Sequence, residues 1–248
     1  MRVLQREAQG HRPYMEDRWC NVAVTKNIQC VGIFDGHGGS LIAEMCAFNF
    51  PLVIKQGILE LGTPNMHHIL KQSFHIMDEL ARGCHSPHVG STAVVALIMD
   101  SSVWFANAGD SMAMVVYLSG ESELVSYEHK VENEKERIQG EGGRITYDDG
   151  CARVEQTLNV SRSIGDHHMK RHVISTPFIR SVSINFKQIK YVFMASDGVW
   201  DVYNKDHIAA TFQNAPSVDD GLDTILRESI TRGSDNVTMT YLDFACGQ

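Results

Sequence analysis

The sequence predicts an α+β domain in which helices cover antiparallel sheets. Short apolar, β-branched segments follow one another between residues 91 and 127, separated by turns of two or three residues. Strands joined so closely must run antiparallel. Helical patterns occur in two pairs, one on either side of this strand-rich region. With 248 residues the chain can bury a sizeable core, and we expect one domain over residues 1–248.

The N-terminal third predicts two strands followed by two helices. Cys20–Val24 and Cys30–Phe34 are apolar segments of strand length. Ser40 is a suitable N-cap for a helix over Leu41–Leu61, in which Pro51 is expected to cause a kink or a split. Thr63 and Pro64 then resemble the start of a second helix, which is expected to continue to about residue 82.

The middle of the chain predicts consecutive strands and then a loop. The expected strands are Ser91–Asp100, Val103–Ala108, Met112–Leu118 and Leu124–Tyr127. A solvated helix is expected to begin at residues 132–137, and the Gly- and Asp-rich residues 140–151 are expected to form a loop.

The C-terminal third predicts three strands and two helices. Arg180–Phe186 and Tyr191–Ala195 are apolar strand candidates, and Asn204–Asn214 and Val218–Thr231 have helical spacing. A last strand is expected over Val237–Asp243. Layers of helix on antiparallel sheet are therefore the predicted architecture.

Composition excludes several classes of function. The chain has 22 basic and 30 acidic residues, a net charge of −8, which argues against a nucleic-acid binder. Its longest uninterrupted apolar run, Ala93–Met99, is too short to span a membrane. The first residues contain no apolar segment typical of a signal peptide. Six scattered cysteines without a C-x-x-C pair indicate free thiols rather than a zinc site. We expect a cytosolic or nuclear protein.

Acidic residues gather at the ends of the predicted strands. Five Asp-containing segments stand there: Met15–Asp17, Phe34–Gly39, Ala108–Ser111, Ala195–Gly198 and Gly233–Asn236. If they meet, such carboxylates cannot all remain ionised without a counter-charge. All-oxygen ligand sets favour Mg²⁺ or Mn²⁺ over zinc. The alternative is that each Asp merely forms a turn, which Asp does readily.

Seven motifs in a fixed order make the sequence resemble the metal-dependent Ser/Thr protein phosphatases of type 2C. They are Arg12-x-x-Met15-Glu16-Asp17, Phe34–Gly39, Gly90–Ala93, Asn107–Ser111, Leu158–Asp166, Ser196–Asp201 and Asp235-Asn236. The resemblance extends from about Glu7 to Asp243. It implies a four-layer αββα sandwich, in which two antiparallel sheets are flanked by helices and a two-metal cleft lies at one end.

The resemblance also implies a set of metal-binding residues. That set comprises Glu16, Asp17, Asp35, the Gly36 carbonyl, Asp110, Asp197 and Asp235. In the family pattern Asp35 bridges two Mg²⁺ or Mn²⁺ ions, and Asp17 acts through metal-bound water. Asp110 matches the position associated with a third, weaker metal site.

Catalytic roles follow from the same resemblance. Arg12 is expected to bind the substrate phosphate, and His37 to protonate the leaving serine or threonine oxygen. With Asp35, these form the expected catalytic group, supported by Asp201. The implied reaction is direct attack by a metal-bridging hydroxide on phosphoserine or phosphothreonine. We expect phosphorylated proteins as partners, no nucleic acid or membrane partner, and a monomer.

Alternatives and departures remain. A catalytically inactive scaffold or regulator could share this fold, although every acidic ligand position is filled. Cys-x5-Arg, Gly-Asn-His-Glu and P-loop patterns are absent. Met112 replaces an Arg that is usual in the family, and the segment 167–181 is short. The basic run 167–172 either attracts phosphorylated substrate through Lys170 and Arg171 or is an exposed loop.

Overall fold

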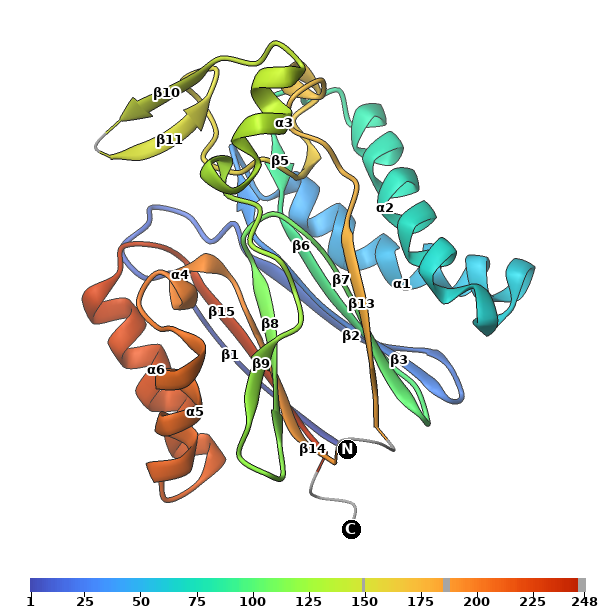
Figure 1. Ribbon diagram of the computed structural model, residues 1–248, viewed down its shortest axis with the longest axis vertical. Coiled ribbons are helices and arrows are strands. Elements are labelled where there is room, and N and C mark those ends of the chain that lie inside the picture. The colour runs from blue at the N-terminus through green and yellow to red at the C-terminus, as the bar shows by residue number, and fades with distance from the viewer. Residues whose placement is uncertain (149, 185–187, 245–248) are drawn as a thin grey trace.

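The computed structural model describes residues 1–148, 150–184 and 188–244, and it confirms the α+β fold class (Figure 1). Two five-stranded antiparallel sheets face each other, and a pair of helices covers the outer face of each. The four-layer αββα arrangement implied by the resemblance is therefore present.

The first sheet has the strand order β1-β15-β14-β8-β9. Its strands are β1 (Arg2–Ala8), β8 (Met112–Tyr117), β9 (Ser122–Leu124), β14 (Ile189–Ala195) and β15 (Val237–Asp243). Strand β1 was not predicted, because all its residues are exposed or half-buried and give no clear apolar alternation. β9 lies earlier in the chain than the strand expected at residues 124–127.

The second sheet has the order β13-β7-β6-β3-β2. Its strands are β2 (Arg18–Thr25), β3 (Ile28–Phe34), β6 (Ala93–Ile98), β7 (Ser102–Ala108) and β13 (Phe178–Ser183). Residues 185 and 186, the end of one predicted strand, lie outside the described residues. Buried apolar side chains such as Val31, Phe105 and Val192 fill the space between the two sheets.

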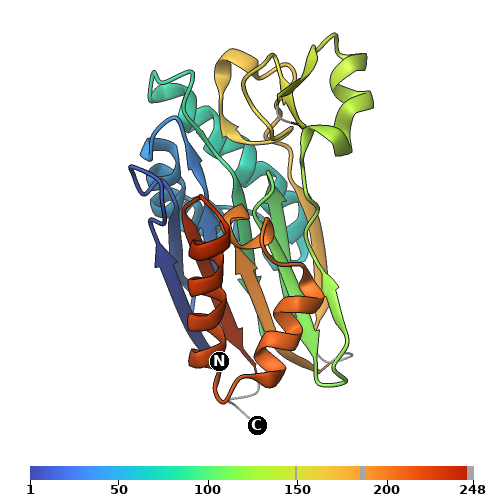
Figure 2. The ribbon, with the colours of Figure 1, turned by 90° about the vertical axis from the view of Figure 1, so that its left-hand side faces the viewer.

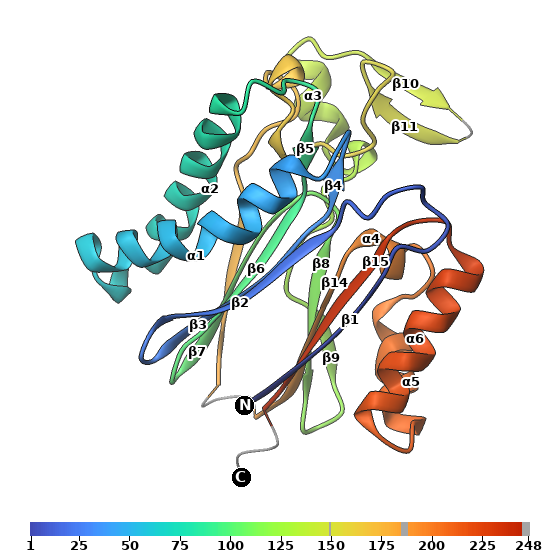
Figure 3. The ribbon, with the colours of Figure 1, turned by 180° about the vertical axis from the view of Figure 1, so that it is seen from behind.

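Helices α1 (Leu41–Leu61) and α2 (Met66–Gly83) cover the second sheet, and Figure 3 shows α1 lying across it. A 3-10 turn, η1 (Thr63–Asn65), joins them. The helix α1 continues through Pro51, whose ring is buried, so it is not split. Among the described residues α1 is the one helix long and apolar enough to cross a membrane, but it packs against α2, β2 and β3.

Helices α5 (Lys205–Asn214) and α6 (Val218–Arg232) cover the first sheet and face the viewer in Figure 2. The Asn204 side chain caps α5 by accepting hydrogen bonds from two backbone N–H groups, and the Ser217 side chain caps α6 by accepting one, from the Asp220 N–H. A single turn, α4 (Asp197–Trp200), follows β14 at the end of the sheet.

A small module, here called the cap, stands at one end of the sandwich (Figure 1). It comprises residues 131–173 and has its own apolar cluster, which includes Val131, Ile138 and Val154. Its elements are η2 (Val131–Glu134), α3 (Lys135–Gly140), β10 (Ile145–Asp148), β11 (Cys151–Val154), β12 (Ile164–Gly165) and η3 (His167–Met169). The predicted loop at residues 140–151 is wrong, because β10 and β11 form a hairpin there.

Three two-residue strands join the cap to the sandwich. β5 (Gly90–Ser91) pairs with β12 of the cap on one side and with β4 (Gly36–His37) on the other. Gly90 is thereby opposite both His37 and Gly165. This small sheet fixes the cap beside the strand ends that carry the predicted site residues.

Candidate active site

A cleft of about 290 Å³ opens where strands of both sheets end beneath the cap. Asp35 directly follows β3, and Asp197 begins α4, with one residue between it and the end of β14. Asp110 lies in the turn between β7 and β8, and Asp235 lies just before β15. The rigid strands therefore deliver four carboxylates to one place, although these residues are up to 200 positions apart in the chain.

Most of the predicted site residues line this cleft. They are Arg12, Glu16, Asp35, Gly36, His37, Asp110, Asp197 and Asp235. The cap contributes Arg153 and residues 157–160 to the same cleft. Residues 158–160 belong to one of the seven motifs, but the sequence assigned none of these residues to the site. The functional roles of these residues remain predictions, but their convergence is a property of the fold.

The carboxylates of the cleft are buried and repel one another. Burial raises the pKa of Asp35 well above its ordinary value, and the neighbouring charges of Asp17 and Asp197 raise it further. The pKa of Asp197 is also raised well above its ordinary value. Burial is the largest cause, and the charge of Asp110 is the next. Burial also raises the pKa of Asp17 and of Asp110, to about 6 in each case. Such a set binds either protons or other cations.

The donor set suits a hard divalent cation. Two buried carboxylate oxygens, Oδ2 of Asp110 and Oδ1 of Asp197, have no hydrogen-bond partner among the described residues. A Cβ atom at Gly36 would stand 2.6 Å from the Glu16 carbonyl oxygen, so only glycine lets these two backbones approach. All the predicted metal ligands are oxygens, as Mg²⁺ and Mn²⁺ prefer. Within the described part of the chain, however, no three acidic, His or Cys side chains already form a coordination group.

Arg12 occupies part of the cleft. Its Nη2 lies 2.5 Å from Oδ2 of Asp235, one of the predicted metal ligands. About half of the Arg12 side chain is exposed, so the guanidinium can reach a ligand from solvent. A guanidinium at the mouth of an acidic cleft is well suited to hold a phosphate.

Asp17 lies behind the cleft rather than in its wall. Its carboxylate is buried and accepts a hydrogen bond of 2.8 Å from Ser196 Oγ. Asn236 holds the neighbouring loop, because its Oδ1 accepts from the Glu16 N–H and its Nδ2 donates to the carbonyls of Gln9 and Tyr14. Ser196 and Asn236 were present in the motifs but were assigned no role, since their partners are distant in sequence.

Asp201, the predicted supporting residue, lies outside the cleft. It is exposed and pairs with Lys130, 3.0 Å away. The ammonium of Lys130 in turn lowers the pKa of Asp110, opposing the effect of burial. Asp201 therefore contacts Lys130 rather than the cleft wall, and its charge also raises the pKa of Asp110 and of Asp197.

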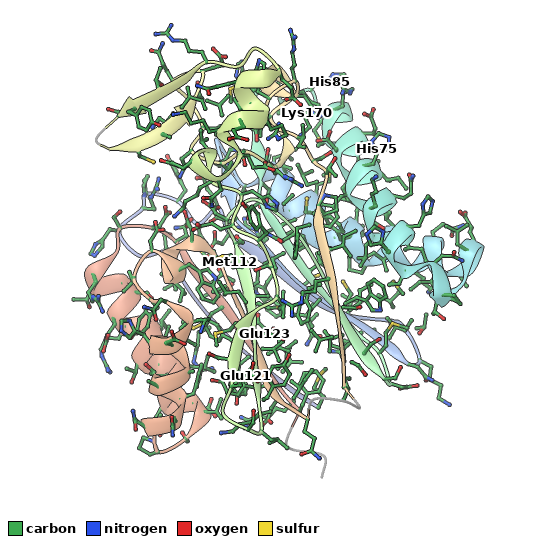
Figure 4. All side chains as sticks on the ribbon, viewed as in Figure 1. His75, His85, Met112, Glu121, Glu123 and Lys170 are labelled. Carbon is green, nitrogen blue, oxygen red and sulfur yellow. The ribbon has the colours of Figure 1, made fainter. Side chains whose placement is uncertain are left out.

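Met112, a departure from the family pattern, and Lys170, of the basic run, both lie outside the lining of the cleft. Met112 is buried at the first position of β8, where it pairs with Ala195 in the sheet and does not line the cleft (Figure 4). Lys170 lies between the cap and α2 (Figure 4), with 17% of its side chain exposed. It pairs with Asp78 at 2.7 Å, so the prediction that Lys170 attracts substrate is wrong. Arg171 is exposed.

Comparison with known families identifies this arrangement. The family model for Protein phosphatase 2C matches residues 4–236, which is nearly the whole chain. The chain belongs to the protein phosphatase 2C family. Among its curated relatives, Probable protein phosphatase 2C 71 of Arabidopsis thaliana is 32% identical over 226 residues, covering 86% of this chain and 48% of the relative. Protein phosphatase 1L of Bos taurus is 30% identical, covering 95% and 70%.

Solved structures share the fold of this chain. A C. elegans sex determining protein superimposes with a TM-score of 0.85 at 25% identity, covering 98% of this chain and 64% of that protein. A serine-threonine phosphatase 2C from Toxoplasma gondii has the same fold, with a TM-score of 0.80 at 17% identity and coverage of 97% and 94%. The chain spans about half to three quarters of the length of the curated relatives it matches.

Proposed function

We propose that the chain is a metal-dependent protein phosphatase that hydrolyses phosphoserine and phosphothreonine in proteins. One observation carries this proposal. The cleft gathers carboxylates whose pKa values are raised by burial and mutual repulsion, and two of their oxygens lack partners among the described residues. Membership of the protein phosphatase 2C family supplies the reaction class.

The residues that would hold two divalent ions are Glu16, Asp35, the Gly36 carbonyl, Asp197 and Asp235, with Asp110 at a weaker third site. When bound, the ions would offset the carboxylate charge, lower the pKa of a water used as nucleophile and screen the phosphate dianion. Asp17 would support this set from behind the cleft wall. Because Arg12 now contacts Asp235, metal and phosphate binding would release Arg12 to the substrate.

The remaining chemistry belongs to side chains of the protein. Arg12 would hold two phosphate oxygens with its planar guanidinium and so fix the direction of attack. His37 would donate a proton to the leaving oxygen, because a serine or threonine alkoxide is a strong base and leaves poorly. General-acid catalysis of this kind typically contributes about 10²–10⁴-fold.

Hydrolysis of phosphoserine and phosphothreonine peptides by the purified chain tests the proposal. We expect turnover with Mn²⁺ or Mg²⁺ and none with EDTA. An absence of turnover with either metal would favour the inactive scaffold, and turnover that persists in EDTA would contradict the metal mechanism.

A further inference from the structure

The candidate proton donor His37 has a buried carboxylate partner that belongs to the cap. Nε2 of His37 lies 2.7 Å from Oδ2 of Asp166, a residue 129 positions later in the chain. The His37 side chain is 26% exposed and lines the cleft, whereas that of Asp166 is 1% exposed. The small sheet β4-β5-β12 brings the two together, since His37 ends β4 and Asp166 follows β12.

Because Gly90 has no side chain, the side chains of His37 and Asp166 can come into contact beside it. A Cβ atom at position 90 would stand 2.1 Å from Asp166 Oδ2 and 2.5 Å from His37 Nε2. Any side chain there would force the imidazole and the carboxylate apart. The glycine of the Gly90–Ala93 motif is thus explained by the contact it permits.

The turn that carries Asp166 is firmly anchored. Asp166 has a left-handed backbone conformation, with φ of +51°, which non-glycine residues rarely adopt. Lys170 Nζ donates to the carbonyls of Ser163 and Gly165, and the Asp78 carboxylate accepts from the Gly165 N–H. Ser163 Oγ also donates to Asp166 Oδ2, at 2.5 Å. The carboxylate is therefore held toward His37.

Stability alone does not account for a carboxylate at this position. Oδ1 of Asp166 is buried and has no hydrogen-bond partner among the described residues. A buried, half-satisfied carboxylate usually costs free energy. Burial would raise the pKa of Asp166, but hydrogen bonds from His37 and Ser163 bring it below its ordinary value, so the group stays charged.

We propose that Asp166 is the positioning residue for His37, an inference that rests on the proposed function. Asp166 holds Nε2–H, which leaves Nδ1 as the ring nitrogen available to a bound substrate. As the P–O bond to the leaving oxygen breaks, the Nδ1 proton passes to that oxygen. The ring becomes neutral and keeps the proton on Nε2. The attacking water releases a proton to solvent, from which Nδ1 is recharged.

Two substrates with different leaving groups test this role. p-Nitrophenolate is a weak base that leaves without a proton, whereas the alkoxide of a phosphothreonine peptide needs one. In D166N we expect kcat for the peptide to fall about 10²-fold or more, as loss of general-acid catalysis predicts. We expect kcat for p-nitrophenyl phosphate to change less than about threefold, since no proton donor is needed. KM should change little for either substrate.

Two further variants separate positioning from damage to the fold. G90A leaves both side chains in place but wedges them apart, so it should reproduce the selective loss on the peptide. D100N makes the same Asp-to-Asn change in an exposed turn at residue 100, away from the cleft, and should affect neither substrate. Equal losses on both substrates in D166N, or no loss on the peptide, would overturn the proposal.

A readout independent of turnover uses ¹⁵N-histidine NMR of the metal-free protein at fixed pH. In the unaltered chain we expect the neutral His37 ring to carry its proton on Nε2. In D166N we expect a mixture of tautomers, and an unchanged tautomer would contradict the proposal. If the unaltered chain hydrolyses neither substrate, the proposed function fails, while the NMR experiment still decides whether Asp166 orients His37.

Discussion

At the scale of single residues, the cleft aspartates serve the proposed metal site but destabilise the metal-free protein, because they repel one another. Asp35 and Asp197 lie close enough to interact directly, and burial and like charge raise the pKa of both. Proteins keep such groups together when a cation compensates them. This single feature links the proposed metal requirement to the stability of the metal-free protein.

Replacing Asp197 by Asn should separate these two effects. We expect kcat for a phosphopeptide in Mn²⁺ to fall by roughly 10²–10³-fold, the usual cost of losing one preorganised electrostatic group. The metal-free variant should unfold at a higher temperature than the unaltered chain, because one repelling charge is gone. Each 1 kcal/mol corresponds to about 2–4 °C for a chain of this size.

Turnover assays and thermal unfolding in EDTA check both parts of this prediction. The matched control is D100N, in which an exposed carboxylate away from the cleft is neutralised. It should retain most of the activity. A D197N variant with ordinary activity would remove Asp197 from the proposed metal set.

At the scale of elements, the cap is held together internally by a cluster of charges around Glu134. Glu134 pairs with Arg137 at 2.9 Å and also with Arg162, and it accepts a hydrogen bond from Ser161 Oγ. Burial acts to raise the pKa of Glu134, but hydrogen bonds from Arg162 and Arg137 outweigh it and lower the pKa to about 2. The carboxylate therefore joins the start of the cap to its residues 161 and 162.

We expect E134Q to loosen the cap while the sheets remain folded. Removing one partner of a largely buried ion pair leaves the arginines uncompensated, which typically costs several kcal/mol. Hydrogen exchange of backbone amides should then become at least about tenfold faster within residues 131–173 and stay unchanged in β6 and β14. E136Q, an exposed change two residues later in α3, is the control, and equal exchange in both variants would contradict this role.

The sequence predicted elements well where the apolar pattern is regular. Helix α1 begins and ends at Leu41 and Leu61, and β15 spans Val237–Asp243, as expected. The sequence did not predict β1 or the β10–β11 hairpin, whose strands contain polar or glycine-rich residues. These strands form because they pair with another strand, and their residues show no regular apolar alternation.

The site was predictable from motifs only in part. The motifs brought together the lining residues from Arg12 to Asp235, whose roles stay predictions. They did not reveal the contact of Asp166 with His37 or the burial of Lys170. The contact and the burial both depend on segments that are distant in the sequence and that the small sheet and α2 place side by side. A local sequence pattern cannot predict such neighbours.

At the scale of the whole molecule, lowering the pH to about 4 should stabilise the metal-free protein. Asp17 and Asp110 have folded-state pKa values of about 6, above their ordinary value of 3.8. The folded state thus binds protons more tightly than the unfolded state, and stability is lost as the pH rises from about 4 through 6. Below this window the sign reverses for Glu134, whose contribution is lost as the pH falls toward 2.

Unfolding by urea between pH 4.5 and 7.5 tests this prediction. In EDTA we expect the free energy of unfolding to fall with rising pH, by on the order of 2 kcal/mol per group. With Mn²⁺ present the decline should disappear or reverse, since bound cations replace the protons. D110N should reduce the slope in EDTA, and a slope that is independent of metal would contradict the proposed cation site.

The pairing of β1 with β15 has a consequence for how this chain can be rearranged. Arg2 lies opposite Asp243, so the two ends of the described chain are neighbours. From the cleft, both strands extend about 20 Å to that end, at roughly 3.3 Å per residue. In a circular permutant, these two ends would be linked and new ends would be made at the exposed turn around Gly120. Every strand would then keep its present neighbours. Circular permutation should therefore leave the cleft intact, and a protein fused at either end would be held away from an arriving substrate.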